Sequence, residues 1–416
     1  MSRFLFTNMW TDDLGLPMRT VPIARELKRR GHDVAFCNPM KAPSEVIKDA
    51  GLANIAPEIH KAVPSKFAPM TPEIWNMNHF FSMVPASCLD EDFVRDGIQA
   101  IVKIVNSFGP DAVVDSWNPS AWVASRVTGR PLMTVIQADQ HPANRGFIWW
   151  RDTPADVPTP VPVMNKILAD YGLKSICDMA ELLVGDVTLC VGIPETDPIP
   201  AGQSVTHIGP MIYRLADETL PAWIDEFRGD KPLIWVYAGN PRYAAGLGIA
   251  VYADSIVVLR TAVEALSTED VSVIMTTGHH SLPDELSRLP GNFRCEPFLP
   301  GIPLAEKSNL IIHHGGHGSC MTSLYAGTPT VVIPTYSERE SNARRLCSLG
   351  VAEMLLPTVE ASGEKRLSAD DLRTKVRQVL SDKSFAQRSA KLSEKARKYD
   401  GVNRAADMAE DLSRRC

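Results

Sequence analysis

Residues 310–319 read Leu-Ile-Ile-His-His-Gly-Gly-His-Gly-Ser, an apolar run that passes into a glycine-rich turn. The run has the length and composition of a buried strand, and the residues after the turn favour a helix. Glycines at such a turn let backbone amides approach an anion, and a helix N-terminus adds partial positive charge. His314 can donate a hydrogen bond to a phosphate oxygen, and Ser319 can donate one or cap the helix. The stretch predicts a phosphate site, with tight packing of strand on helix as the alternative.

A metal site is a second interpretation of the same residues, because His313, His314 and His317 fall within five positions. Side chains alternate along a strand, so those of His313 and His314 should point in opposite directions. No carboxylate or cysteine stands beside them in the sequence, and we expect no metal here. The acidic residues 90–92 resemble a metal-binding Asp-x-Asp, but they precede a helix, where negative side chains suit the dipole. We interpret them as a capping cluster.

The succession of strand and helix recurs along the whole chain. Apolar runs of strand length fall at residues 3–8, 33–37, 112–115, 132–137, 187–191, 233–238, 271–276, 310–313 and 330–333. Amphipathic runs of helix length fall at residues 18–30, 93–107, 254–266, 318–326 and 341–349. This alternation is typical of parallel sheets covered by helices on both faces, and it occurs twice. The sequence predicts an α/β protein of two doubly wound, Rossmann-like domains.

The domain boundaries are placed where this rhythm lapses. Glycine and proline in Ile208-Gly209-Pro210 stop regular structure, and a polar stretch follows. We expect a first domain at 1–210, a linker at 211–230 and a second domain at 231–390. Residues 391–416 are charged and helix-forming, and we expect them to pack as helices back towards the first domain.

Composition bounds the class of protein. The chain has 416 residues, 43 Lys and Arg against 49 Asp and Glu, a net charge of -6, and eight cysteines without a Cys-x-x-Cys pair. An acidic balance argues against a nucleic-acid partner, and scattered cysteines favour a reducing compartment. Neither a signal peptide nor a bilayer span is apparent. We expect a cytoplasmic protein, a monomer or homodimer, whose partners are small molecules.

Two segments break the alternation, at residues 64–85 and 147–162, where aromatic and methionine side chains stand among prolines. Such side chains on irregular segments can line an adaptable apolar pocket, although loop residues packed onto the core would look the same. The residues expected to line such a pocket are Trp75, Phe80, Phe81, Met83, Trp117 and Trp149.

A longer motif surrounds the glycine turn. Its parts are His314 to Ser319, Tyr325-Ala326-Gly327-Thr328-Pro329, Val331-Val332-Ile333-Pro334, Asn342-Ala343 and Leu349-Gly350-Val351. In order and spacing it resembles the donor signature of the UDP-glycosyltransferase family, including bacterial natural-product glycosyltransferases. Weaker matches are Phe298-Leu299-Pro300, Gly239, Thr277-Gly278, Ile208-Gly209-Pro210 and residues 29–34. The resemblance implies a GT-B fold, with an acceptor-binding N-terminal domain facing a nucleotide-sugar-binding C-terminal domain across a cleft.

The resemblance also implies a donor site at the matching positions. These are Gly239, Asn240, Thr277, Phe298, Leu299, His314, Gly315, Gly316, Gly318, Ser319, Glu338 and Arg339. The family usually has an acidic residue followed by glutamine for the sugar hydroxyls, where this chain has Glu338 and Arg339. Arginine cannot accept a hydrogen bond as glutamine does. Either the sugar is unusual or Arg339 points elsewhere, for example as an exposed charge at a helix start.

The general base of the family is missing. The family's Gly-His falls on Gly15-Leu16 here, and leucine cannot take a proton. The candidates to replace it are Asp13, Asp12, Asp115, His141 and Asp139, in that order of preference with Asp139 last. Asp115 matches the aspartate that orients the family's histidine, and it either faces the acceptor or caps a strand end.

The resemblance implies an inverting, metal-independent glycosyltransferase without a cofactor. Its co-substrate would be a nucleotide-diphosphate sugar based on UDP or dTDP, and its acceptor a hydrophobic small molecule in natural-product or antibiotic biosynthesis. Two alternatives stay open. One is a non-catalytic auxiliary protein that binds nucleotide sugar or aglycone, suggested by Leu16 and Arg339. The other is a GT-B nucleotide-sugar epimerase, which needs an acid–base pair in the donor cleft.

Overall fold

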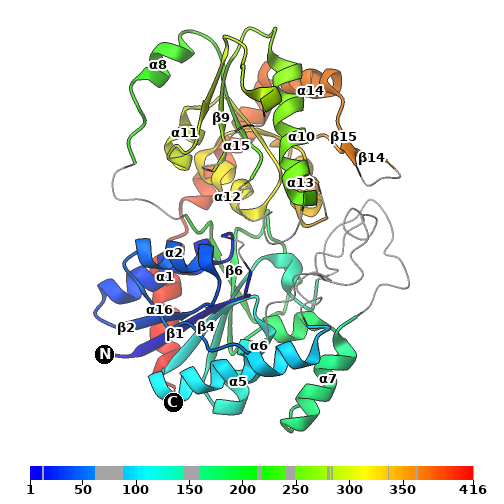
Figure 1. Ribbon diagram of the computed structural model, residues 1–416. Coiled ribbons are helices and arrows are strands. Elements are labelled where there is room, and N and C mark those ends of the chain that lie inside the picture. Colours follow the sequence, from blue (N-terminus) through cyan, green and yellow to red (C-terminus); the bar gives the residue numbers. More distant parts are fainter. Residues whose placement is uncertain are drawn as a thin grey trace.

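The computed structural model describes residues 1–11, 14–60, 88–144, 159–212, 218–239, 249–278, 282, 284–335, 337–360 and 364–415. Two parallel sheets lie one above the other, each with helices packed against it (Figure 1). The prediction of two doubly wound α/β domains is confirmed. All nine predicted strands are present, and their ends differ by no more than one residue.

The first sheet has seven strands in the order β3-β2-β1-β4-β5-β6-β7, and every described pair is parallel. The strands are β1 (Arg3–Asn8), β2 (Asp33–Cys37), β3 (Ala53–Asn54), β4 (Ala112–Ser116), β5 (Leu132–Ile136), β6 (Val187–Val191) and β7 (Val205–Gly209). The order runs outward from β1 on one side and from β4 on the other. Ligands bind at such a switch point, outside the carboxyl ends of the strands.

The helices of the first domain are α1 (Pro17–Arg29), α2 (Lys41–Asp49), α5 (Glu91–Phe108), α6 (Pro119–Thr128) and α7 (Val161–Asp170), with short turns η1 (Ala138–Gln140) and η2 (Met179–Leu183). Asp90 caps α5 by accepting from the backbone N–H of Phe93 at 3.0 Å, and Gly109 ends that helix at φ 63°. The interpretation of residues 90–92 as a capping cluster is therefore correct.

The second sheet has six parallel strands in the order β10-β9-β8-β11-β12-β13. They are β8 (Leu233–Tyr237), β9 (Ser272–Thr276), β10 (Phe293–Glu296), β11 (Leu310–His313), β12 (Thr330–Val332) and β13 (Ala352–Met354), followed by a hairpin of β14 (Thr358–Val359) and β15 (Lys365–Arg366). The helices are α8 (Trp223–Arg228), α10 (Ile249–Leu266), α11 (Gly301–Lys307), α12 (His317–Ala326), α13 (Ser337–Ser348) and α14 (Ala369–Ser381), with the turn η4 (Asp284–Leu286). The switch point between β8 and β11 places the glycine-rich turn, which follows β11, where a ligand is expected.

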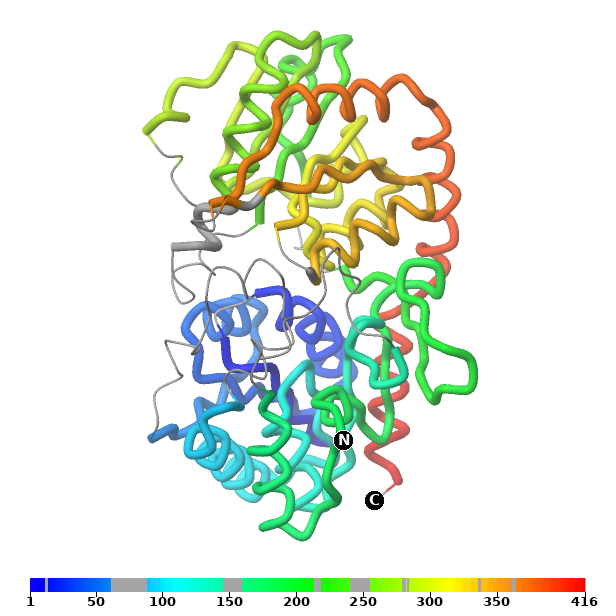
Figure 2. Tube along the Cα trace, turned by 90° about the vertical axis from the view of Figure 1, so that its right-hand side faces the viewer, coloured from blue at the N-terminus to red at the C-terminus, as the bar shows by residue number. Residues whose placement is uncertain are grey.

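Two C-terminal helices connect the domains. Helix α15 (Lys383–Ala396) packs against α12, and α16 (Gly401–Ser413) packs against α1 and the first sheet. Figure 2 shows the chain descending from one domain to the other along one side of the molecule. Arg30 at the end of α1 bonds to Asp407 and to Asn403, and Nε2 of His32 lies 2.9 Å from Glu410.

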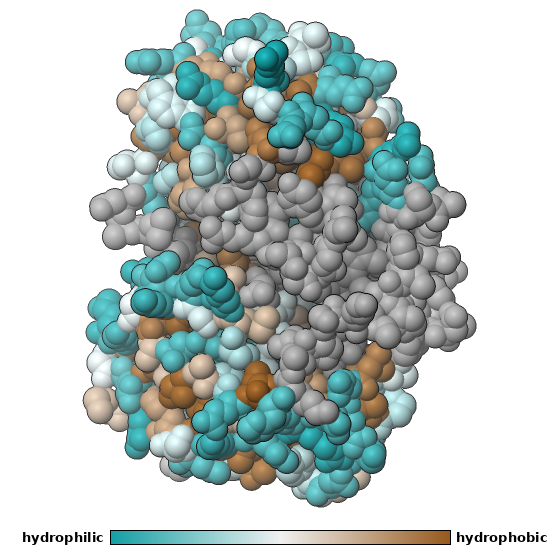
Figure 3. All heavy atoms as spheres, in the orientation of Figure 1, coloured by the Kyte–Doolittle hydropathy of each residue, from teal (hydrophilic) through white to brown (hydrophobic). Residues whose placement is uncertain are grey.

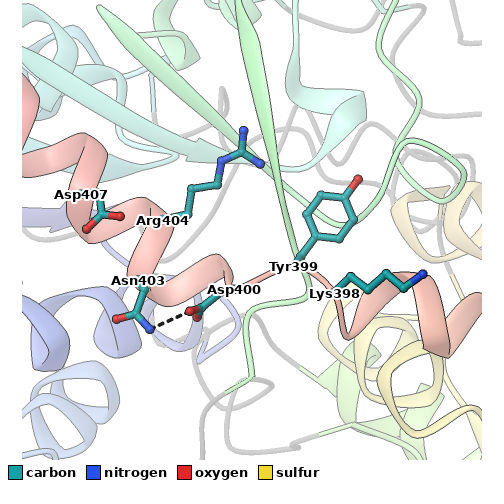
Figure 4. A pocket seen from close by; sticks show the side chains of 6 residues that line it. All are labelled: Lys398, Tyr399, Asp400, Asn403, Arg404 and Asp407. Atoms are coloured by element: carbon teal, nitrogen blue, oxygen red, sulfur yellow. Dashed lines mark hydrogen bonds between the residues drawn. The ribbon is translucent and has the colours of Figure 1, made fainter.

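Between α15 and α16 the chain returns to the first domain through a bend at residues 397–400, here called the elbow, which contacts the end of β7. Gly209 has φ 77°, and a Cβ there would lie 2.3 Å from Cβ of Tyr399; a Cβ on Gly401 would lie 2.3 Å from the carbonyl oxygen of Ile208. Side chains of Lys398, Tyr399, Asp400, Asn403, Arg404 and Asp407 line a hollow of about 480 Å³ here (Figure 4). None of these residues belongs to the predicted donor or acceptor site.

Hydrophilic side chains cover much of the outer end of each domain on the face shown in Figure 3. Among the helices of the described residues, none combines the length and hydropathy that a membrane span requires.

Candidate functional site

The glycine-rich turn between β11 and α12 is built around His314. Its ring lies between two glycines: a Cβ on Gly239 would come within 3.3 Å of the ring, and one on Gly316 within 2.6 Å of Nε2. Tyr237 contacts it edge-on, with ring centroids 5.7 Å apart. Two of the predicted donor-site positions, Gly239 and Gly316, therefore require glycine for the same physical reason: any larger side chain would displace the imidazole.

Gly315 fills a different role in the turn. It has φ 85°, and a Cβ there would lie 2.8 Å from the carbonyl oxygen of Arg339 and 2.9 Å from Cγ1 of Val332. Here the packing interpretation of the glycines is correct. Gly318 is the opposite case, since it is exposed and no described protein atom lies within 4 Å of its Cβ position.

The imidazole of His314 is buried and neutral. Burial lowers its pKa well below the usual value, and the nearby Arg339 guanidinium and His313 lower it further. Among the described residues, its Nδ1 has no hydrogen-bond partner. A hydrogen bond to the backbone of Tyr237 acts in the opposite direction on the pKa. A neutral imidazole carries one N–H, so His314 can donate a hydrogen bond to an oxyanion at the N-terminus of α12 in the tautomer that has its proton on Nδ1.

Glu338 and Arg339 are both buried at the start of α13. Oε1 of Glu338 accepts from the backbone N–H of His317 at 3.3 Å and from Nδ2 of Asn342 at 2.8 Å, and burial raises its pKa. Nη1 of Arg339 donates to Oγ1 of Thr335 at 2.6 Å. Of the two alternatives for Arg339, an exposed charge at a helix start is wrong, because the residue is only 5% exposed.

The other predicted donor residues lie at the carboxyl edge of the second sheet or beyond it. Thr277 is buried directly after β9, and Ser319 is half-buried in the first turn of α12. Leu299 is buried, whereas Phe298 is 50% exposed, a large apolar ring open to a ligand. Asn240 lies outside the described residues.

On the acceptor side, Asp115 stands at the end of β4, next to the switch point. Its carboxylate accepts from Oγ1 of Thr7 at 2.6 Å and from the backbone N–H of Asn118 at 2.9 Å. Burial raises the pKa of Asp115 to about 7, although these hydrogen bonds act in the opposite direction. Both oxygens have partners within the domain, which favours the strand-end cap over direct contact with the acceptor.

Trp117 follows two residues later and is the only described acceptor candidate. It is 3% exposed and has φ 73°, the one positive value among the described residues other than glycine. A bulky residue in this conformation is strained, and such strain gathers at functional sites. Trp75, Phe80, Phe81, Met83 and Trp149 lie outside the described residues.

The loop between β1 and α1 starts beside this strand end, because the backbone N–H of Met9 donates to the carbonyl oxygen of Ser116 at 3.1 Å. Asp12 and Asp13 lie outside the described residues. Leu16, at the position of the family's base, is 2% exposed and belongs to the core. His141 is buried, its Nδ1 accepts from the N–H of Ala143 at 3.1 Å, and burial lowers its pKa.

Comparison with known proteins finds a family model that matches most of the second domain, and relatives that match longer parts of the chain. Residues 260–400 match the family model of the erythromycin biosynthesis protein CIII-like C-terminal domain. The chain is 32% identical over 209 residues to 4'-demethylrebeccamycin synthase of Lentzea aerocolonigenes, covering 50% of this chain and 45% of that protein. It is 27% identical over 329 residues to a PGL/p-HBAD biosynthesis glycosyltransferase of Mycobacterium tuberculosis, covering 72% and 70%. The chain has the GT-B fold and is similar to glycosyltransferases.

Solved structures agree on this fold. The calicheamicin glycosyltransferase CalG4 superposes with a TM-score of 0.71 at 20% identity, covering 99% of this chain and 98% of that one. VinC in complex with DTDP superposes with a TM-score of 0.69 at 19% identity, covering both chains completely. The predicted resemblance to natural-product enzymes of this fold is confirmed.

The chain also has buried contacts between its domains that its sequence did not indicate. Asp139, a candidate base, accepts from Oγ of Ser341 at 2.8 Å and pairs with the guanidinium of Arg345. Asp139 is therefore a hydrogen-bond and ion-pair partner of α13 across the domain interface, which argues against a role as the base. His317 donates or accepts through Nε2 at 3.0 Å from Asp197, in the segment after β6.

The three histidines of the turn point to three different places. Nδ1 of His313 accepts from the N–H of Gly315, His314 lies between its glycines, and His317 reaches the first domain. Within the described part of the chain, no group of three His, Cys, Asp or Glu side chains is arranged to hold a metal ion.

Proposed function

We propose that this chain is a glycosyltransferase, and that it inverts the anomeric centre as it moves a sugar from a nucleotide-diphosphate sugar to a hydrophobic small molecule. We further propose that it needs no metal ion or cofactor. The observation that carries the proposal is the neutral, buried His314, held between Gly239 and Gly316 at the N-terminus of α12. This arrangement offers hydrogen-bond donors to a diphosphate.

The donor side supplies electrostatic stabilisation of the leaving group. Negative charge grows on the diphosphate as its bond to the anomeric carbon breaks. The N-terminal end of α12 and the N–H of His314 would face that charge, and the buried guanidinium of Arg339 adds a positive charge nearby. Donors that are fixed in advance in a water-poor site are an effective form of catalysis.

The sugar would lie against the start of α13. Glu338 uses Oε1 for His317 and Asn342, which fixes the orientation of its carboxyl group. The carboxyl group suits a sugar hydroxyl, as implied by its match to the family's acidic residue. Phe298 and Leu299, with Thr277 and Gly239, would form the nucleotide end of the donor site.

The acceptor side needs one base. In a direct displacement, the acceptor oxygen bonds to the anomeric carbon as the diphosphate leaves, and the acceptor proton passes to the base. We propose Asp13 or Asp12 for this role, because their loop begins at the switch point, where Met9 bonds to Ser116. Asp115 would support that loop through Thr7 and Asn118. His141, whose lowered pKa keeps it neutral, is the second choice.

The acceptor class follows from the relatives. Their names concern rebeccamycin, mycobacterial PGL, calicheamicin and spinosyn, which points to a natural product as the acceptor. VinC and the spinosyn rhamnosyltransferase SpnG were solved with thymidine diphosphate, which favours a dTDP-sugar over a UDP-sugar here. We propose a cytoplasmic enzyme that works as a monomer or homodimer.

Titration calorimetry with UDP, dTDP and their sugars tests the donor site. Binding should be lost in His314→Ala and kept in His60→Ala, which changes an exposed histidine of the first domain. Absence of nucleotide binding to the wild type would refute the donor assignment.

A donor-hydrolysis assay then tests turnover, with Asp12→Asn, Asp13→Asn, Asp115→Asn and His141→Gln compared to find the base. One observation favours a non-catalytic auxiliary role: buried Leu16 occupies the position of the family's base. Tight donor binding with neither hydrolysis nor transfer would establish that role.

A further inference from the structure

We propose that Asp197 of the first domain is a positioning residue for the donor site, acting through His317 across the domain interface. Oδ1 of Asp197 lies 3.0 Å from Nε2 of His317, the first residue of α12. The two side chains are 2% and 4% exposed. Nothing in the sequence marks Asp197, which stands in an ordinary loop after β6.

The carboxylate is fixed by its own domain. Oδ1 accepts from the backbone N–H of Ala138 at 3.2 Å, and Oδ2 accepts from Oγ1 of Thr196 at 3.0 Å. Gly192 has φ 116°, and a Cβ there would lie 2.1 Å from Oδ2. The first domain thus presents a prearranged acceptor to α12, because a side chain at position 192 would push the carboxylate away.

The contact continues into the glycine-rich turn. The backbone N–H of His317 donates to Glu338, and Asn342 donates both to Glu338 and, at 2.9 Å, to the carbonyl oxygen of Gly315. Asp197 is therefore connected by hydrogen bonds to the turn that carries His314 and to the carboxyl group expected to bind the sugar. Small movements of the α12 N-terminus would therefore shift both the turn that carries His314 and the carboxyl group of Glu338.

A second contact across the domain interface also joins an acidic side chain of the first domain to a basic side chain of the second. Asp139 receives Arg345 and Ser341 of α13, so two acidic side chains of the first domain receive basic side chains of the second. Although burial acts the other way, His317 and then Arg345 lower the pKa of Asp197 below its usual range. A charged acceptor makes the stronger hydrogen bond to the imidazole N–H.

The consequence is that the donor cradle reaches its binding geometry only when the domains are in contact. This inference rests on the proposed function, since it assumes that the turn binds a nucleotide diphosphate. Removing the hydrogen bond to a charged partner should weaken nucleotide binding at least about tenfold.

The experiment measures dTDP and UDP affinity by calorimetry in three variants. His317→Leu removes the donor and should bind at least about tenfold more weakly than the wild type. His317→Gln keeps an N–H that can reach Asp197 and should bind nearly as well as the wild type. Lys395→Ala is the matched control: its pair with Glu195, 2.7 Å long, crosses the same interface without touching the turn, and its loss should leave affinity unchanged.

Wild-type affinity in folded His317→Leu would overturn the inference, and so would equal weakening in His317→Gln or Lys395→Ala. A buried carboxylate left without its partner can unfold the chain. If His317→Leu does not fold, Asp197→Asn combined with His317→Leu removes the buried charge, and wild-type affinity in that variant would also overturn the inference. No nucleotide binding to the wild type would instead refute the proposed function.

Discussion

Gly316→Ala tests whether His314 is held in place by the turn. Gly316 has φ -58° and ψ 141°, which alanine adopts without strain, so the backbone is not at issue. The new Cβ would lie 2.6 Å from Nε2 of His314, and an ordinary contact of 3.4 Å requires a shift of about 0.8 Å. The ring cannot yield freely, because Gly239 and Tyr237 contact it on other sides.

The expected cost is that of an overpacked site, about 1–3 kcal/mol in the free energy of unfolding. For a domain of about 200 residues this lowers the melting temperature by about 2–12 °C. Gly318→Ala is the matched control, since no described atom lies within 4 Å of its Cβ position. Alanine within a helix is favoured over glycine by up to about 1 kcal/mol, so this variant should be as stable as the wild type or slightly more stable.

A double-mutant cycle isolates the clash. In a His314→Ala background the ring is gone, so Gly316→Ala should cost little, and the coupling free energy should nearly equal the cost of the single change. Calorimetric melting of the wild type, both single variants and the double variant provides the four values. An equal cost of Gly316→Ala with and without His314 would refute this account of the turn, as would no cost in either background.

Three further perturbations have defined outcomes. Asp115 has a folded pKa of about 7, above its unfolded value, so ionising it destabilises the fold. Relative to Asp115→Asn, the wild type should gain about 2.5 kcal/mol of unfolding free energy as the pH falls from about 8 to about 5 in urea denaturation, and parallel curves would contradict this. Arg30→Ala should cost about 1–2 kcal/mol, less at high salt, because it frees α16 from α1; a salt-independent loss would argue against the ion pairs. Gly209→Ala should lower the free energy of unfolding by about 2–5 kcal/mol, because of backbone strain and the clash with Tyr399. Gly202 has φ 86° but lies in open space, so Gly202→Ala should lower it by only about 1–2 kcal/mol in the same calorimetric melting experiment. Equal costs at the two glycines would contradict the packing at the elbow.

Sequence patterns predicted the interior strands of both sheets but missed strands nearer the edges. Interior strands such as β4 are buried along their whole length and therefore read as continuous apolar runs. In these two sheets the strands that escaped prediction are β3, β7, β10 and β13, which have two to five residues and mixed burial. The two-residue strands β14 and β15 of the hairpin escaped it as well. Strand β7 was also obscured by Gly209, which was assigned to the domain junction although it still pairs with β6.

The candidate site divides in the same way. The turn at residues 314–319 was predictable because strand, glycines and helix are adjacent in the chain. The contacts of His317 with Asp197 and of Arg345 with Asp139 join residues 120 and 206 positions apart, and a single aspartate has no local signature. The sequence therefore leaves Asp139 among the candidate bases, although its oxygens bind α13. It also leaves an exposed charge open as an alternative for Arg339, although the guanidinium is buried and donates to Thr335.

The attachment of α16 to α1 matters for anyone who builds chimeras from relatives of this chain. A single crossover after β7 would import a foreign α16, which would have to present partners to Arg30 and His32 of the host. A second crossover at the elbow, within residues 397–400, keeps α16 with the surface on which it evolved. An exchangeable donor module would then end at α15, and the last helix of the chain would travel with the acceptor module instead.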